Sequence, residues 1–228
     1  MNITMKLRLE DKNLVLKLRQ KGYTYKELMS AIPNLSKSTI SGWVKHLELT
    51  PKIIKNIEIR SKNAREKGRL KAALILINKR KERDAQLCEI ARQEFEKFKK
   101  DPLFIFGTAL YWAEGSKKTR SFQFANSDPR ITKIMLRWIE KYLRIPRKEV
   151  RIRLYIHRIY EKENCEDWWE RILGISKEKF SKTVYKPTLH QTKKNIQYKG
   201  CVRLDITKVA PWIKTMEWQN CFCEDNDV

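Results

Sequence analysis

The stretch spanning residues 51–100 restricts the fold of this chain more than any other feature. It is nearly free of glycine, and between residues 52 and 83 it carries 12 basic residues against 3 acidic ones. That composition favours one or two long helices. Residues 1–50 show short helical patterns with sharp turn signals, whereas residues 101–228 mix aromatic-rich strands with helices. We therefore expect an α+β protein with three sections: a three-helix head, a long basic helical linker and a mixed α/β domain.

The head begins with the signals of two short helices. A first helix is expected over residues 11–20, and Gly22 ends it because glycine tolerates the left-handed cap conformation. Thr24 and Glu27 then have the spacing of a capping box, in which each residue binds the other's backbone N–H. That pair is expected to begin the second helix.

A third helix is expected from Ser36, as its cap, to Leu47. Ile40, Val44 and Leu47 fall at helical spacing and are predicted to face the core. The same pattern leaves a set of polar side chains outside: Lys37, Ser38, Thr39, Ser41, Lys45 and His46.

Segments 23–28 (YTYKEL) and 36–44 (SKSTISGWV) resemble the helix-turn-helix of homeodomain-like and recombinase-type DNA-binding domains. The resemblance implies that the third helix enters the major groove and that its N-terminal side chains meet base edges. Lysines there would neutralise phosphates, and hydroxyl groups would contact phosphates or bases. The alternative is a three-helix bundle that binds only another protein.

The charge of the chain points to a polyanionic partner. Its 228 residues include 50 Lys and Arg against 27 Asp and Glu, a formal net charge of +23. Double-stranded DNA is the expected partner, because each phosphate contact releases condensed counterions, although an anionic membrane surface would also fit.

No apolar run approaches the roughly 20 residues that cross a bilayer, and the start lacks the apolar stretch of a secretory signal. We expect a cytoplasmic, nucleoid-associated protein without a membrane partner.

An apolar run at residues 72–77 interrupts the basic linker. Such a patch on a polar helix is typical of a contact with another domain or with a second copy of the chain. The surrounding cations would either follow the DNA backbone or form a solvated spacer; the composition favours neither.

Residues 103–116 are predicted to form an apolar helix. Asp101 and Pro102 make a good helix start, and Gly115 makes a good stop. Glu114 lies in the last turn, where the helix dipole disfavours a carboxylate. A bound cation is one candidate for stabilising that charge.

Segment 107–115, GTALYWAEG, resembles the nine-residue motif of the LAGLIDADG homing-endonuclease family. Three positions match the motif in residue type: Leu110, Ala113 and Gly115. Glu114 takes the place of the second, functional acid of the motif, whereas Trp112 stands where the family has its first acid. The chain therefore carries one copy of the motif, and that copy contains one acidic residue.

The pattern downstream of this motif predicts a mixed α/β domain, and the resemblance extends over residues 103–218. The expected elements are a strand from 122 leading into a helix over 129–143, a strand over 150–158, a helix over 166–173, strands over 179–186 and 200–206, and a helix over 209–218. Tryptophans expected in the core are Trp112, Trp138, Trp168 and Trp169. The short helix departs from the family's αββαββα order.

The strand over 150–158 alternates apolar and polar residues, as a half-buried strand does. Its outward residues include Arg151, Arg153 and His157, and a basic loop contributes Lys193 and Lys194. Cationic side chains on one sheet face suit a DNA groove.

The family resemblance implies a saddle-shaped sheet over DNA, with two motif helices at a two-fold axis. A chain with one motif would need a homodimer through the helix at 103–115. Mg²⁺ or Mn²⁺ at Glu114 would then activate water and stabilise the leaving oxygen. Lys117 or Lys118, or the lysines at 193 and 194, would stabilise the developing charge.

Two functions follow from these patterns. The first is a homodimeric, metal-dependent, site-specific DNA endonuclease, which retention of Glu114 favours. The second is a non-catalytic, sequence-specific transcriptional regulator with the same fold, which Trp112 and the added helix-turn-helix favour.

Overall fold

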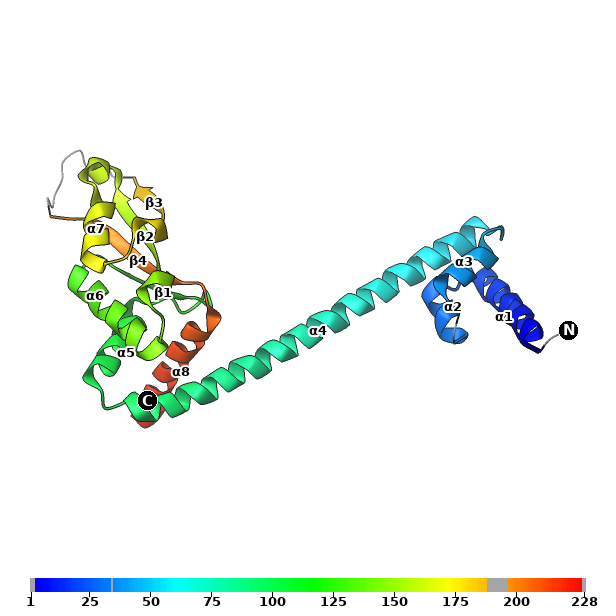
Figure 1. Cartoon of the computed structure of the whole chain (residues 1–228), viewed down its shortest axis with the longest axis horizontal. Helices are drawn as coiled ribbons and strands as arrows, with labels where there is room; N and C mark the ends of the chain where they lie inside the picture. Colours follow the sequence, from blue (N-terminus) through cyan, green and yellow to red (C-terminus); the bar gives the residue numbers. More distant parts are fainter. Residues whose placement is uncertain (1–2, 34, 188–196, 227–228) are drawn as a thin grey trace. The chain divides into compact units, whose positions relative to one another are not determined.

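A computed structural model describes residues 3–33, 35–187 and 197–226 of the chain. It is a mixed α+β protein with one four-stranded sheet among the described residues (Figure 1). The residues group by contact into two compact units, Met1–Lys79 and Arg80–Val228. The boundary lies inside helix α4 (Pro51–Phe98), so the two units share the expected linker of residues 51–100.

The N-terminal unit begins with α1 (Ile3–Gln20), α2 (Tyr25–Ala31) and α3 (Lys37–Val44). Gly22 has φ +85° after α1, and the capping box of Thr24 and Glu27 starts α2, as the sequence predicts. The core of the unit consists of Val15, Leu28, Ile32, Ile40 and Val44. The residues of this small core therefore follow from the turn and cap residues, which fix where the helices begin and end, and from the helical spacing of the apolar residues.

Two helix boundaries in this unit differ from expectation. Helix α1 starts at Ile3 and not at residue 11, because no glycine or proline in residues 3–10 interrupts it. Helix α3 ends at Val44 and not at Leu47, because the Leu47 N–H turns back to the Val44 carbonyl at 3.1 Å. Lys45 is consequently the C-cap residue of α3.

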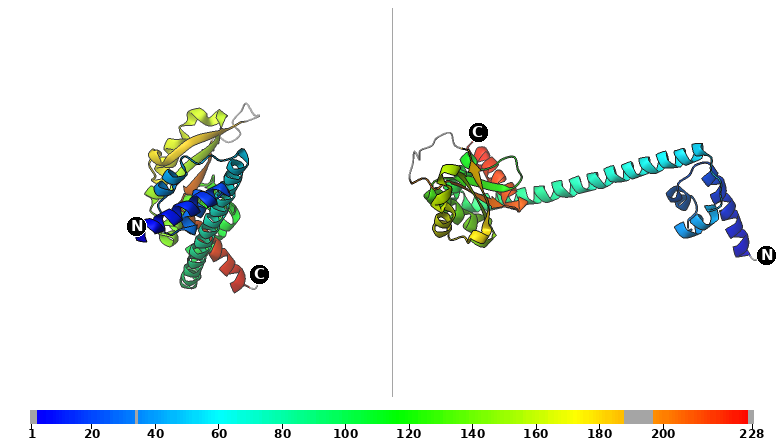
Figure 2. Two further views of the ribbon diagram at one scale, coloured as in Figure 1. Left: turned by 90° about the vertical axis from the view of Figure 1, so that its right-hand side faces the viewer. Right: turned by 90° about the horizontal axis from the view of Figure 1, so that it is seen from above.

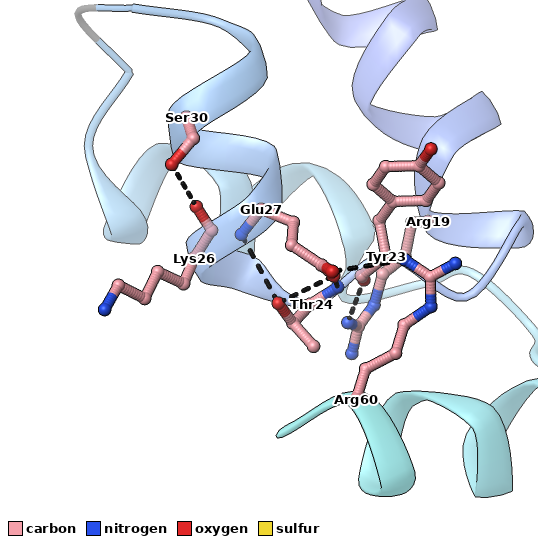
Figure 3. Close-up of polar contacts among 7 residues, drawn as sticks. All are labelled: Arg19, Tyr23, Thr24, Lys26, Glu27, Ser30 and Arg60. Atoms are coloured by element: carbon pink, nitrogen blue, oxygen red, sulfur yellow. Dashed lines mark hydrogen bonds and ion pairs between the residues drawn. The ribbon is translucent and has the colours of Figure 1, made fainter. Parts of the chain in front are cut away.

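The first turns of α4 belong to the N-terminal unit. Arg60 Nη1 lies 3.1 Å from Glu27 Oε1, and its guanidinium carbon lies 4.8 Å from the centre of the Tyr23 ring (Figure 3). Glu27 Oε2 also accepts the Thr24 backbone N–H at 2.7 Å. The same carboxylate therefore caps α2 and binds α4.

Helix α4 is a single helix, which the right-hand view of Figure 2 shows along its length. Ala91 and Phe95 near its end are buried in the core of the C-terminal unit. The apolar run expected at residues 72–77 is largely exposed; the Leu76 side chain is 67% accessible. None of the helices in the described ranges is long and apolar enough to span a membrane.

The C-terminal unit contains four more α-helices, four strands and four short helical turns among its described residues. In chain order they are α5 (Pro102–Glu114), β1 (Phe122–Asn126), α6 (Pro129–Trp138), η1 (Ile139–Leu143), η2 (Arg147–Glu149), β2 (Arg151–His157), η3 (Arg158–Glu163), α7 (Cys165–Leu173), η4 (Lys177–Lys179), β3 (Phe180–Lys186), β4 (Cys201–Ile206) and α8 (Val209–Asp225). The strand order is β1-β4-β2-β3, with β2 and β3 parallel and the other neighbours antiparallel.

Helices α5 and α6 approach closely at Gly107. A Cβ added at this glycine would lie 2.1 Å from Cδ1 of Trp138. The indole N–H of Trp138 donates to the Phe104 carbonyl at 3.2 Å, and its ring packs edge-on against Trp218 at 5.6 Å. The core of this unit is therefore built around an aromatic cluster that needs a residue without a side chain at position 107.

We expect Gly107→Ala to destabilise the C-terminal unit by about 1 to 3 kcal/mol, because the added methyl group overpacks the Trp138 contact. Gly68→Ala is the matched control: a Cβ there meets nothing within 4 Å. That change should be neutral or should stabilise helix α4 by up to about 1 kcal/mol. Urea denaturation of the full chain measures both. Equal effects of the two changes would contradict this packing.

Glu27 should make the stability of the N-terminal unit depend on pH. The Thr24 backbone N–H lowers the pKa of Glu27 below its ordinary value of 4.5; the Thr24 hydroxyl and Arg60 lower it further, and burial opposes them. Because this pKa is lowered on folding, the stabilisation is complete above the unfolded value and is lost as pH falls through the folded one.

Glu27→Gln keeps a capping amide but should remove that pH dependence, whereas Glu27→Ala should cost about 1 kcal/mol at neutral pH. Urea titrations followed by NMR signals of Leu28 and Val44 report on this unit in the intact chain. An unchanged pH profile in Glu27→Gln would be evidence against the proposed linkage.

Candidate nucleic-acid interface

Helix α3 presents a polar side to solvent while its apolar side anchors it. Ile40 and Val44 are buried, which confirms that part of the sequence prediction. Among the residues predicted to bind DNA, four are exposed on this helix or at its end: Lys37, Ser38, Ser41 and Lys45. Thr39 is half-buried.

Hydroxyl groups at the start of α3 are ordered by its cap. Ser36 Oγ accepts the Thr39 backbone N–H at 3.1 Å. It also lies 2.7 Å from the Ser38 hydroxyl and 2.9 Å from the Thr39 hydroxyl. The cap therefore holds the hydroxyl groups of Ser38 and Thr39 together at the N-terminus of α3, where backbone N–H groups also favour an anion.

The sheet of the C-terminal unit has one apolar face and one polar face. Along β2, Ile152, Leu154 and Ile156 are buried in the core. The alternate residues Arg151, Arg153, Tyr155 and His157 are at least partly exposed, as the alternation predicts. Residues paired with them across the sheet lie on the same face: Asp205, Arg203, Cys201, Ser181, Val184 and Lys186.

Cations outnumber carboxylates on this polar face. Arg203 Nη2 lies 3.0 Å from Asp205 Oδ2, so Asp205 is already occupied by a neighbour on its own strand. The Tyr155 ring has Arg203 at 5.5 Å and Lys186 at 5.7 Å from its centre. Arg203 and Lys186 were not among the sequence candidates, although the alternation along β4 would have revealed Arg203.

Two nitrogen atoms on this face lack partners within the described part of the chain. Arg153 Nε and His157 Nδ1 are buried atoms without a hydrogen bond there. A buried polar atom without a hydrogen-bond partner costs free energy. The Lys193 and Lys194 candidates lie outside the described residues.

Glu114 is the last residue of α5, and its side chain is exposed. Gly115 then caps the helix through a 2.8 Å bond from its N–H to the Tyr111 carbonyl, and it forms a β-bridge with Phe124. The pKa of the Cys201 thiol is raised mainly by burial, with Lys186 opposing and the charge of Glu114 adding to the increase.

Lys117 and Lys118 are exposed in the loop that follows Glu114. The three candidate catalytic residues fall within the five consecutive residues 114–118 at the end of α5. Among the described residues, no group of three or more His, Cys, Asp or Glu side chains is arranged to hold a metal ion. A carboxylate at this position would contribute only one protein ligand per chain.

The side of α5 that faces away from the core is apolar. Ile105, Phe106 and Trp112 are 42%, 46% and 44% exposed. Trp112 therefore does not belong to the core as expected; Trp138 and Trp169 are fully buried, and Trp168 packs partly buried against the core. A groove of about 300 Å³ lies between this side of α5 and the end of α8, lined by Ile105, Ala109, Trp112, Phe222, Cys223 and Asn226.

Residues 102–113 contain no Lys, Arg, Asp or Glu, although the whole chain carries 77 such residues among 228 (50 plus 27). The exposed side of α5 is therefore an uncharged surface in a strongly basic chain. Surfaces of this kind are typical of contacts with another protein.

The chain was also compared with protein-family models, with curated proteins and with solved structures, and none of them matches it.

Proposed function

We propose that this protein binds double-stranded DNA through both of its units. The observation that carries the proposal is the polar face of the sheet, where Arg151, Arg153 and Arg203 stand together on a partly exposed surface. Arginine on such a surface binds phosphates and guanine edges by paired N–H donors. The net charge of +23 supplies long-range attraction toward the duplex.

In this proposal α1, α2 and α3 form a helix-turn-helix. Helix α3 enters the major groove, with Ser38 and Ser41 toward base edges or phosphates and the lysines at its ends toward phosphates. The exposed polar side of α3 supports this role. A helix that bound a partner protein would instead be expected to present apolar residues there.

We further propose that the C-terminal unit is a LAGLIDADG-like domain that cleaves DNA as a homodimer through α5. The uncharged, exposed side of α5 supports pairing of two copies, which would bring two Glu114 carboxylates together. One exposed carboxylate per chain fits Mg²⁺ or Mn²⁺, because such ions take one or two carboxylates together with waters and substrate phosphates. The bound ion would supply an activated water and charge stabilisation at the leaving oxygen.

The residues of the chain have separate tasks in this reaction. The arginines of the sheet hold the duplex, and Lys117 or Lys118 stabilises negative charge at the phosphate. Pairing through α5 sets the distance between the two sites.

A second candidate function is a non-catalytic, sequence-specific regulator. The exposed Trp112 favours it, because this residue stands where the family motif has its first acid. The two functions share DNA binding and differ only in cleavage.

Lys37→Ala and Lys45→Ala should each weaken duplex binding and lower the slope of log affinity against log salt by about 0.9 per lost phosphate contact. Lys97→Ala, an exposed lysine on α4 far along the chain from α3, is the control. Fluorescence anisotropy at several salt concentrations gives both quantities. If the two α3 variants retain the wild-type slope, α3 does not contact phosphates through these lysines.

Glu114→Gln should abolish cleavage while preserving binding, because it removes the carboxylate but keeps the size of the side chain. The test incubates the protein and the variant with a plasmid library in Mg²⁺ or Mn²⁺ and reads nicked and linear products. Cleavage lost only in the variant supports the nuclease. Tight, specific binding by the wild-type protein without any nicking supports the regulator.

A further inference from the structure

The loop between α5 and β1 carries Lys117 and Lys118, and the structure fixes it at two points. The first point is Ser116. Its N–H donates to the Gln123 carbonyl at 2.9 Å, and its own carbonyl accepts the Tyr111 hydroxyl at 2.9 Å and the Trp212 indole N–H at 3.1 Å. These bonds join the start of the loop to α5, β1 and α8.

The second point is Arg120, four residues further along. Its Nη2 donates to Asp84 Oδ2 of α4 at 2.5 Å, and its guanidinium carbon lies 5.5 Å from the centre of the Trp212 ring. Arg120 also has φ +51°, a left-handed conformation that a residue with a side chain adopts at a cost. The contacts with Asp84 and Trp212 offset that cost and hold the turn.

The surroundings of Asp84 favour a charged carboxylate that can bind Arg120. Its side chain is only 22% exposed, and its second oxygen accepts Arg83 Nη2 at 2.9 Å. Burial raises the pKa of Asp84, but the hydrogen bonds from Arg120 and Arg83 outweigh it and the pKa is lowered, so the carboxylate stays charged at neutral pH.

We propose that Asp84 of α4 is a positioning residue for the DNA-cleaving site: by binding Arg120 it holds the loop that presents Lys117 and Lys118 beside Glu114. This inference rests on the proposed nuclease function. It adds a residue from outside the segment that resembles the endonuclease family, since that segment begins at residue 103. Lys117 and Lys118 lie between the two fixed points, and the exposed side chain of each is free to meet a phosphate.

Asp84→Asn tests the proposal, because it keeps the shape of the side chain and removes its charge. We expect the cleavage rate constant at saturating DNA to fall by about tenfold to a hundredfold, as for other losses of positioning, while Kd for the duplex stays unchanged. Arg120→Gln should have the same effect, and the double variant should be no worse than either single one, because the two residues act as a pair. Glu82→Gln, an exposed acid on the same helix, should leave cleavage at the wild-type rate.

Amide hydrogen exchange provides a readout that does not require cleavage. Asp84→Asn should accelerate exchange in residues 117–121 and leave the core strands β2 and β4 protected. If the wild-type protein does not cleave, the nuclease proposal fails, and this exchange measurement alone decides whether Asp84 orders the loop. Unchanged exchange in the loop would overturn the inference, and so would additive losses of cleavage in the double variant.

Discussion

The contact between Gly107 and Trp138 determines how the C-terminal unit presents its surfaces. With no side chain at position 107, the indole ring lies directly against the backbone of α5 and donates to the Phe104 carbonyl. One side of α5, a helix that is almost wholly apolar, is therefore buried in the core. Its opposite side, with Ile105, Phe106 and Trp112, is left at the surface, and the helix ends with Glu114 exposed next to β1.

The same packing gives the sheet two different faces. Helices and aromatic side chains bury the apolar face, whereas the other face collects arginines that cannot be buried without a partner. Asp205 offsets only a part of this positive charge, through its ion pair with Arg203, so the face remains cationic. Charges held on a folded sheet lose less conformational freedom when they bind a polyanion than charges on a flexible tail do.

Local chemistry predicted much of this fold. The capping box at Thr24, the cap at Ser36, the proline start and glycine stop of α5, and the alternation along β2 all appear in the structure where the sequence places them. These features depend on residues within a few positions of each other. Periodicity, however, does not tell which side of an apolar helix is buried, and the core position expected for Trp112 was wrong for that reason. The family resemblance and the DNA-binding role stay predictions.

Contacts between segments that lie far apart in the sequence could not be predicted, for a different reason. Arg203 and Lys186 reach Tyr155 only through strand pairing, and Asp84 meets Arg120 across 36 residues of chain. No local pattern encodes such a pair, because either residue alone is an ordinary charge on a basic, helical chain.

Helix α4 shows why these distant pairs matter. At its start Arg60 binds the carboxylate that caps α2, and near its end Arg92 lies 2.7 Å from the buried Glu217 of α8. Each unit thus binds α4 through an ion pair with a carboxylate on one of its own helices. The two end regions of the helix are therefore structural parts of the two units, and through Asp84 the helix contacts the loop that follows α5.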